Sequence, residues 1–110
     1  MKKAGIIRCQ QTEDMCPANT CLKVATGGKL AFEVVGPCEV IGLVSCGGCP
    51  GKRAVLRAKM FVNMGVEVIA LSSCISRGAP AGFSCPNAET MKQAIRRQVG
   101  EDVTILDHTH

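Results

Sequence analysis

Short, nearly continuous apolar segments alternate along this chain with longer segments in which apolar residues recur at helical spacing. The continuous segments are residues 4–7, 40–44, 66–71 and 103–106. Runs of this kind, rich in β-branched residues, are typical of buried strands in a parallel sheet. The periodic segments are residues 16–26, 50–64 and 87–99, and glycine follows each of them. Helical spacing closed by glycine predicts a helix in each segment.

This alternation predicts an α/β fold of three layers, with a four-stranded, mostly parallel sheet and helices on both faces, of the flavodoxin-like or Rossmann-like kind. Residues 30–35 have β-branched ends and predict an additional strand at the edge of the sheet. Residues 75–84 contain glycine and proline without any periodicity and predict a loop. A chain of 110 residues has room for one such core, so we expect a single domain over 1–110.

Composition narrows the classes of partner. The net charge of +4 is mild, Trp and Tyr are absent, and only 3 Phe are present, which argues against a nucleic-acid or flavin partner. The apolar stretch after Lys2 and Lys3 is too short for a signal peptide, and no segment approaches the roughly 20 apolar residues of a membrane span. We therefore expect a cytoplasmic protein without membrane contact.

The 8 cysteines are the main chemical signal. A reducing cytosol argues against a framework of disulfides and favours metal binding or thiol redox chemistry. Free cysteine also serves as a small buried apolar residue, so position has to separate the two uses. Cys21 lies on the apolar stripe of its predicted helix, where we expect it to pack in the core. Cys38 has no evident partner in the pattern.

Two regularities place the remaining cysteines. Cysteine precedes proline at 16–17, 49–50 and 85–86, and each pair stands where a helix is predicted to begin, so each sulfur is expected at a helix N-cap. Cys9, Cys46, Cys74 and the pair His108 and His110 each follow a predicted strand. Carboxyl ends of parallel strands share one edge of the sheet, where open α/β sheets bind ligands. The groups expected to meet at that edge are Cys9, Cys16, Cys46, Cys49, Cys74, Cys85 and one or both histidines.

Such a donor set suits more than one soft metal centre. A zinc ion held by four of these ligands would leave thiols to spare, an iron–sulfur cluster on four cysteines also fits, and copper(I) shares the same preference. The unit Cys46-Gly47-Gly48-Cys49 has, by itself, the spacing of a redox dithiol at the start of a helix. The alternative function is therefore a thiol–disulfide oxidoreductase that uses Cys46 and Cys49, with Arg53 nearby.

The whole string of spaced cysteines resembles the CGGC domain family. The resemblance is carried by Cys46-Gly47-Gly48-Cys49-Pro50-Gly51, Cys9-Gln10, Cys16, Cys21, Ser73-Cys74, Cys85-Pro86 and Thr109-His110. It implies a metal-binding domain, with zinc as the metal. The implied ligands are Cys9, Cys16, Cys46, Cys49, Cys74, Cys85 and His110, the last because it matches the family's Thr-His ending. The roles to test are zinc storage, delivery or sensing, against redox chemistry and against an interaction module with a structural metal.

Overall fold

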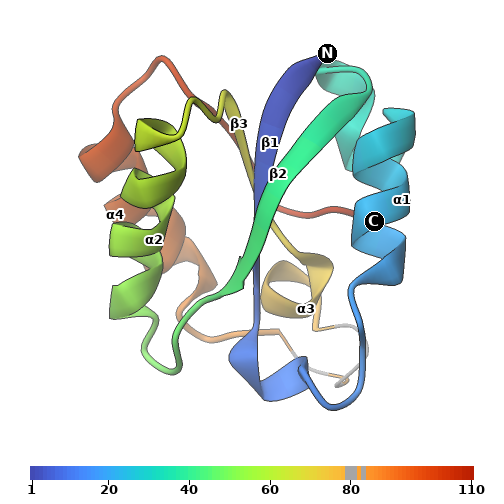
Figure 1. Ribbon diagram of the computed structural model, residues 1–110. Helices are drawn as coiled ribbons and strands as arrows, with labels where there is room; N and C mark the ends of the chain where they lie inside the picture. Colours follow the sequence, from blue (N-terminus) through green and yellow to red (C-terminus); the bar gives the residue numbers. More distant parts are fainter. Residues whose placement is uncertain (79–81, 83) are drawn as a thin grey trace.

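The sheet consists of four parallel strands. A computed structural model describes residues 1–78, 82 and 84–110. In it the strands are β1 (Lys2–Arg8), β2 (Cys38–Ser45), β3 (Val68–Leu71) and β4 (Thr104–Leu106). They lie side by side in the order β2-β1-β3-β4. The carboxyl ends of β1 and β2 lie at the bottom of Figure 1. The predicted parallel sheet is thus confirmed.

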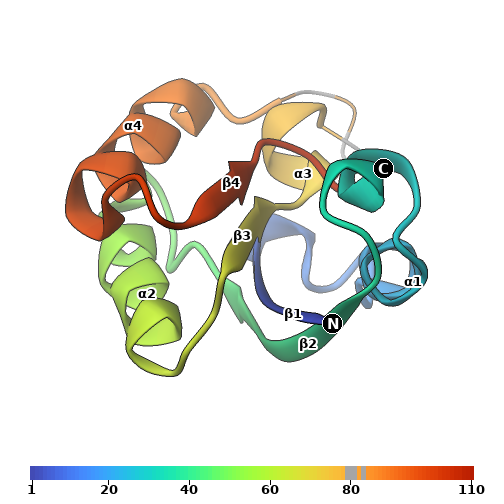
Figure 2. The same ribbon diagram turned by 90° about the horizontal axis from the view of Figure 1, so that it is seen from above.

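Helices cover both faces of this sheet. The helix α1 (Asn19–Gly27) and the 3-10 helix η2 (Leu30–Val34) lie on one face, and α2 (Lys52–Asn63) and α4 (Ala88–Val99) pack together on the other (Figures 1 and 2). The short helices η1 (Gln10–Thr12) and α3 (Ser73–Ser76) lie near the carboxyl ends of the strands. The three-layer prediction is confirmed. None of the described helices is both long enough and apolar enough to cross a bilayer.

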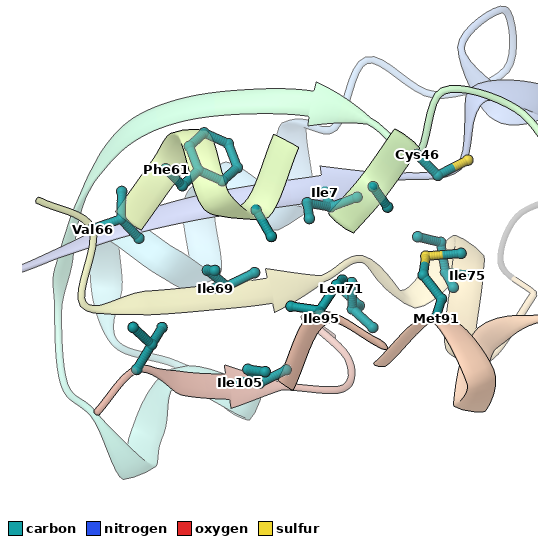
Figure 3. Close-up of a cluster of buried hydrophobic side chains, with 13 residues drawn as sticks. Ile7, Cys46, Phe61, Val66, Ile69, Leu71, Ile75, Met91, Ile95 and Ile105 are labelled. Carbon is teal, nitrogen blue, oxygen red and sulfur yellow. The ribbon is translucent and has the colours of Figure 1, made fainter. Parts of the chain in front are cut away.

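Alternation along the strands divides the core between the two faces. Ile6 packs among the residues under α1, whereas Ile7 packs with the residues of α2 and α4 (Figure 3). Phe61 of α2 lies directly on the sheet, because a Cβ atom at Gly5 would be 2.5 Å from its ring and one at Gly42 would be 2.9 Å from it. These two glycines let α2 approach closely, and α2 in turn fixes the loop that follows β2.

The predicted edge strand at residues 30–35 is wrong, because this segment forms η2. Its backbone closes on itself, with Phe32 N–H donating to Lys29 O at 2.9 Å and Gly36 N–H to Phe32 O at 2.8 Å. Phe32 is fully buried in the core under α1. Packing of the aromatic ring thus overrides the β-propensity of the neighbouring valines.

One edge of the sheet is instead β2, the strand predicted to be buried, and its residues 40–45 are only half-buried. The predicted loop at 75–84 is also partly wrong, since Ile75 and Ser76 belong to α3. Residues 79–81 and 83 of that prediction lie outside the described part of the chain.

The predicted N-caps are displaced by a constant offset. The capping residues are Ala18, Gly51 and Asn87, so each cysteine of a Cys-Pro pair stands two residues before its cap. Ala18 and Gly51 adopt left-handed backbone conformations, with φ of 65° and 90°, that turn the chain into the helix after the proline. Cys16, Cys49 and Cys85 therefore precede the helices rather than cap them.

Candidate thiol site

Four thiols from four different segments lie near one another at the carboxyl edge of the sheet. Cys9 follows β1, Cys46 follows β2, Cys74 lies in α3, and Cys85 precedes α4. The backbone N–H of Cys9 donates to Cys74 Sγ at 3.3 Å. Burial raises the pKa of the Cys9 thiol, and the nearby thiols of Cys46, Cys74 and Cys85 raise it further, while the N–H of Gln11 opposes them. We call Cys9, Cys46, Cys74 and Cys85 the thiol cluster.

The thiol cluster rests on the apolar core below α2 and α4. Cys46 is 5% exposed and belongs to this core together with Ile75 and Met91 (Figure 3). The other three members are half-buried and pack against the same core. Cys85 is tied to α3 by its N–H, which donates to Ile75 O at 2.8 Å. Its sulfur accepts the N–H of Asn87 at 3.3 Å, at the start of α4.

The thiols are neighbours without being assembled around a centre. All eight cysteines are free thiols. Within residues 1–78, 82 and 84–110, no three Cys, His, Asp or Glu side chains stand together as a ready-made set of metal ligands. Closing the thiol cluster on an ion would therefore require its side chains to rotate.

A second group of predicted residues lines a small pocket beside the thiol cluster. Cys16, Cys74 and His110 line it, together with Cys21. The remaining wall comes from Arg8, Thr12, Ala18 and Ser72. Its free space is about 10 Å³, which is the room needed by one water molecule. We call it the Arg8 pocket, and Cys74 is the residue that it shares with the thiol cluster.

Two cysteines lie in the apolar core under α1. Cys21 is 4% exposed, as its place on the apolar stripe predicts, and its sulfur is 3.2 Å from Thr109 Oγ1 and 3.5 Å from Ser72 Oγ. Cys38 is 1% exposed and begins β2, at the end of the sheet opposite the thiol cluster. Its thiol donates to Gly36 O at 3.4 Å. Cys49 is exposed and lines neither the Arg8 pocket nor the surroundings of Cys9.

The hydroxyl of Ser73 holds the last residues in place. It accepts the N–H of Thr109 at 3.2 Å and that of His110 at 2.9 Å, and it donates to His110 O at 2.8 Å. Thr109 is fully buried and His110 reaches the Arg8 pocket. His108 is directed elsewhere, since its Nδ1 pairs with Asp107 Oδ1 at 2.9 Å. This hydrogen bond lowers the pKa of the Asp107 carboxyl. Only one of the two predicted histidines therefore lies beside the thiols.

Arg8 is the site residue that sequence reasoning missed. Its side chain is 8% exposed at the end of β1, and its Nη2 donates to Thr12 O at 3.0 Å and to Cys16 O. It makes no ion pair with any residue that the structure describes. The available signal was a single arginine placed directly after a buried apolar strand and before Cys9.

The comparisons with known proteins identify the family of this chain. A family model described as the CGGC domain matches residues 3–110. The chain belongs to the CGGC domain family. It is 35% identical over 78 residues to the uncharacterized protein MJ0582 of Methanocaldococcus jannaschii, an alignment that spans 66% of this chain and 61% of that relative. This chain thus covers less than two thirds of that relative's length. No solved structure matches the present chain.

The motif that names the CGGC family forms the turn between β2 and α2. Its two glycines have φ of 83° and 100°, conformations that side chains rarely adopt. A Cβ atom at Gly47 would also lie 2.5 Å from Arg53 Cβ, so the first glycine is required for space as well as for its backbone. Ser45 steadies this turn, because its Oγ accepts the N–H of Gly47 at 3.2 Å and an N–H of Arg57 at 2.8 Å. The glycines thus bring a buried Cys46 and an exposed Cys49 onto one tight loop.

Proposed function

We propose that this CGGC domain binds a zinc ion through the thiol cluster. The supporting observation is that Cys9 has three further thiols around it, each from a different segment of the chain. Thiolates are soft ligands, and four of them suit a tetrahedral zinc ion or an iron–sulfur cluster rather than magnesium or calcium. Cys16 and His110, next to the shared Cys74, are secondary candidates for ligands, whereas the exposed Cys49 lies outside the thiol cluster.

The electrostatics of the thiol cluster agree with this proposal. Cys9 is harder to ionise because of burial and because of the thiols around it. A divalent cation would remove that repulsion, so binding would release protons and strengthen as the pH rises. Each cysteine can redirect its sulfur by rotating one bond, which is the movement that binding would demand. A site that assembles only on binding suits storage, delivery or sensing of the metal.

The test is metal analysis of protein purified without oxygen, followed by titration of the metal-free chain with cobalt(II). Because the chain has no Trp or Tyr, thiolate-to-metal bands would stand out in its spectrum. We expect one zinc per chain, and cobalt bands typical of tetrahedral thiolate ligation. Cys49→Ser is the control, since its exposed side chain lies outside the thiol cluster, and it should keep the metal. Absence of zinc and of thiolate bands would refute the proposal, and iron in place of zinc would shift it to an iron–sulfur cluster.

One observation favours thiol–disulfide exchange as a second candidate. Cys49 is exposed whereas Cys46, three residues earlier, is 5% exposed, which matches the division between an attacking and a resolving thiol. The Cys49 thiolate would attack a substrate disulfide, forming a mixed disulfide and releasing one substrate thiol. Cys46 would then attack Cys49, forming the Cys46–Cys49 disulfide and releasing the second substrate thiol. Two electrons pass from the dithiol to the substrate.

The same variant separates the two candidates. Cys49→Ser should abolish the Cys46–Cys49 disulfide and any reduction of a test disulfide such as oxidised glutathione. It should leave zinc binding by the thiol cluster unchanged. If the wild-type protein reduces no disulfide and its two thiols stay unpaired under oxidising buffers, the second candidate is wrong.

A further inference from the structure

Arg8 carries a buried charge without a counter-ion among the described residues. Its side chain is 8% exposed, and no Asp or Glu side chain lines the Arg8 pocket. A buried cation is costly unless a charge or full hydrogen bonding compensates it. Here only Nη2 donates to the described residues, to two backbone carbonyl oxygens. The Nε atom is buried and has no partner among them.

The residues around Arg8 do not use its remaining N–H donors, so these donors are free to bind a ligand in the pocket. The Thr12 hydroxyl is already used, because it donates to Cys9 O at 2.9 Å. The thiol of Cys21 lies among the hydroxyls of Ser72 and Thr109. Two carbonyl dipoles offset part of the Arg8 charge, but they supply no net negative charge. The pocket is therefore an electropositive recess whose strongest free donor is a guanidinium.

The size and lining of the recess select the kind of anion. The free space of about 10 Å³ holds about one water molecule, so a monatomic or diatomic anion would displace the walls less than phosphate or sulfate would. The sulfurs of Cys16, Cys21 and Cys74 make the wall polarisable and poor in strong donors. A guanidinium is itself weakly hydrated. We propose that the Arg8 pocket binds a small, weakly hydrated, monovalent anion, namely a halide or hydrosulfide.

This site is distinct from the proposed metal site, although the two share Cys74. No step of the proposal needs a metal, so it is tested on metal-free, reduced protein with bromide as the probe. Bromide binding is measured from the broadening of the bromide NMR line during titration. Crystals soaked in bromide locate the ion by anomalous scattering.

Two arginine variants supply the comparison. Arg8→Met removes the charge and the hydrogen-bond donors but keeps an unbranched side chain about as long as the aliphatic stem of arginine, and Arg97→Met removes a charge from an exposed position on α4. We expect Arg8→Met to weaken bromide binding about tenfold or more, because a charge-assisted hydrogen bond is lost. Arg97→Met should bind as the wild type does. An anomalous peak is expected within hydrogen-bonding distance of Arg8 Nε.

Equal bromide affinity of Arg8→Met and the wild type would overturn the proposal. So would anomalous peaks confined to the surface, which would indicate an adventitious ion only. Should Arg8→Met fail to fold, as judged by circular dichroism, the wild-type bromide map decides alone. Sulfate should not displace bromide, and displacement by sulfate would contradict the size argument. Displacement at lower concentrations of hydrosulfide than of chloride assigns the site to hydrosulfide, and the reverse order assigns it to halide.

Discussion

Cys9 and Cys38 lie at opposite ends of two adjacent strands and share one physical property. Burial is the largest cause of a raised thiol pKa in both. Their neighbours differ: Cys9 has three further thiols around it, whereas Cys38 is influenced by the ammonium group of Lys2 and the carboxylate of Glu67. Burial alone therefore does not mark a functional thiol. The proximity of other thiols is what distinguishes the two ends of the sheet, and the proposed zinc site depends on it.

The largest expected effect of this difference is on metal affinity. Cys9→Ser removes one proposed zinc ligand from the thiol cluster. Loss of a residue that only supports a metal ligand typically weakens metal binding by roughly 10–100-fold, so loss of a ligand itself should weaken zinc binding by more than that. Cys38→Ser should leave zinc affinity unchanged, because Cys38 lies at the far end of β2. Competition with a chromophoric chelator measures both. If both variants lost the same zinc affinity, the effect would be on folding rather than on ligation. If both kept the wild-type zinc affinity, Cys9 would be excluded as a ligand.

A second expected effect concerns how the carboxyl end is held together. Ser73→Ala removes a hydroxyl that bonds the backbone at Thr109 and His110, and it should lower the free energy of unfolding by about 1–3 kcal/mol. Ser76→Ala is the matched control on the same helix, since the buried Ser76 Oγ has no partner among the described residues. That change should be neutral or slightly stabilising. Denaturant unfolding of both variants makes the measurement, and similar losses would show that helix α3 is sensitive to any truncation.

The spacing of apolar residues and the positions of the cysteines predicted the fold and the gathering of four thiols at one edge of the sheet. Nearly continuous apolar runs located all four strands, and the parallel arrangement followed from the helices between them. A parallel sheet gathers the residues after its strands at one edge, so the proximity of Cys9, Cys46 and Cys74 was predictable without any knowledge of side chains. Cys85 follows by the same logic, because α4 begins at that edge.

What the sequence could not predict depended on packing and on backbone detail. The segment 30–35 forms η2 because Phe32 finds a place in the core, which local propensity does not express. The Cys-Pro pairs precede the helix caps, because a left-handed residue follows two of the prolines. Arg8 was missed because a charged residue after a strand is normally solvated, and only the tertiary structure shows it to be buried.

The smallest expected effect tests the property that Cys9 and Cys38 share. In both, the folded chain holds its proton more tightly than the unfolded chain does, because burial disfavours the thiolate. Below the ordinary thiol pKa of about 8.5 the thiol is protonated in both the folded and the unfolded chain, so the raised pKa does not change folding stability. Above it the unfolded chain ionises first, so folding stability falls as the pH rises. Metal-free Cys9→Ala and Cys38→Ala should each lose less stability than the wild type between about pH 7 and about pH 10, measured by denaturant midpoints. If only one variant loses less stability than the wild type, the effect of burial differs between the two thiols. The two ends of the sheet would then differ in burial as well as in the thiols around each cysteine.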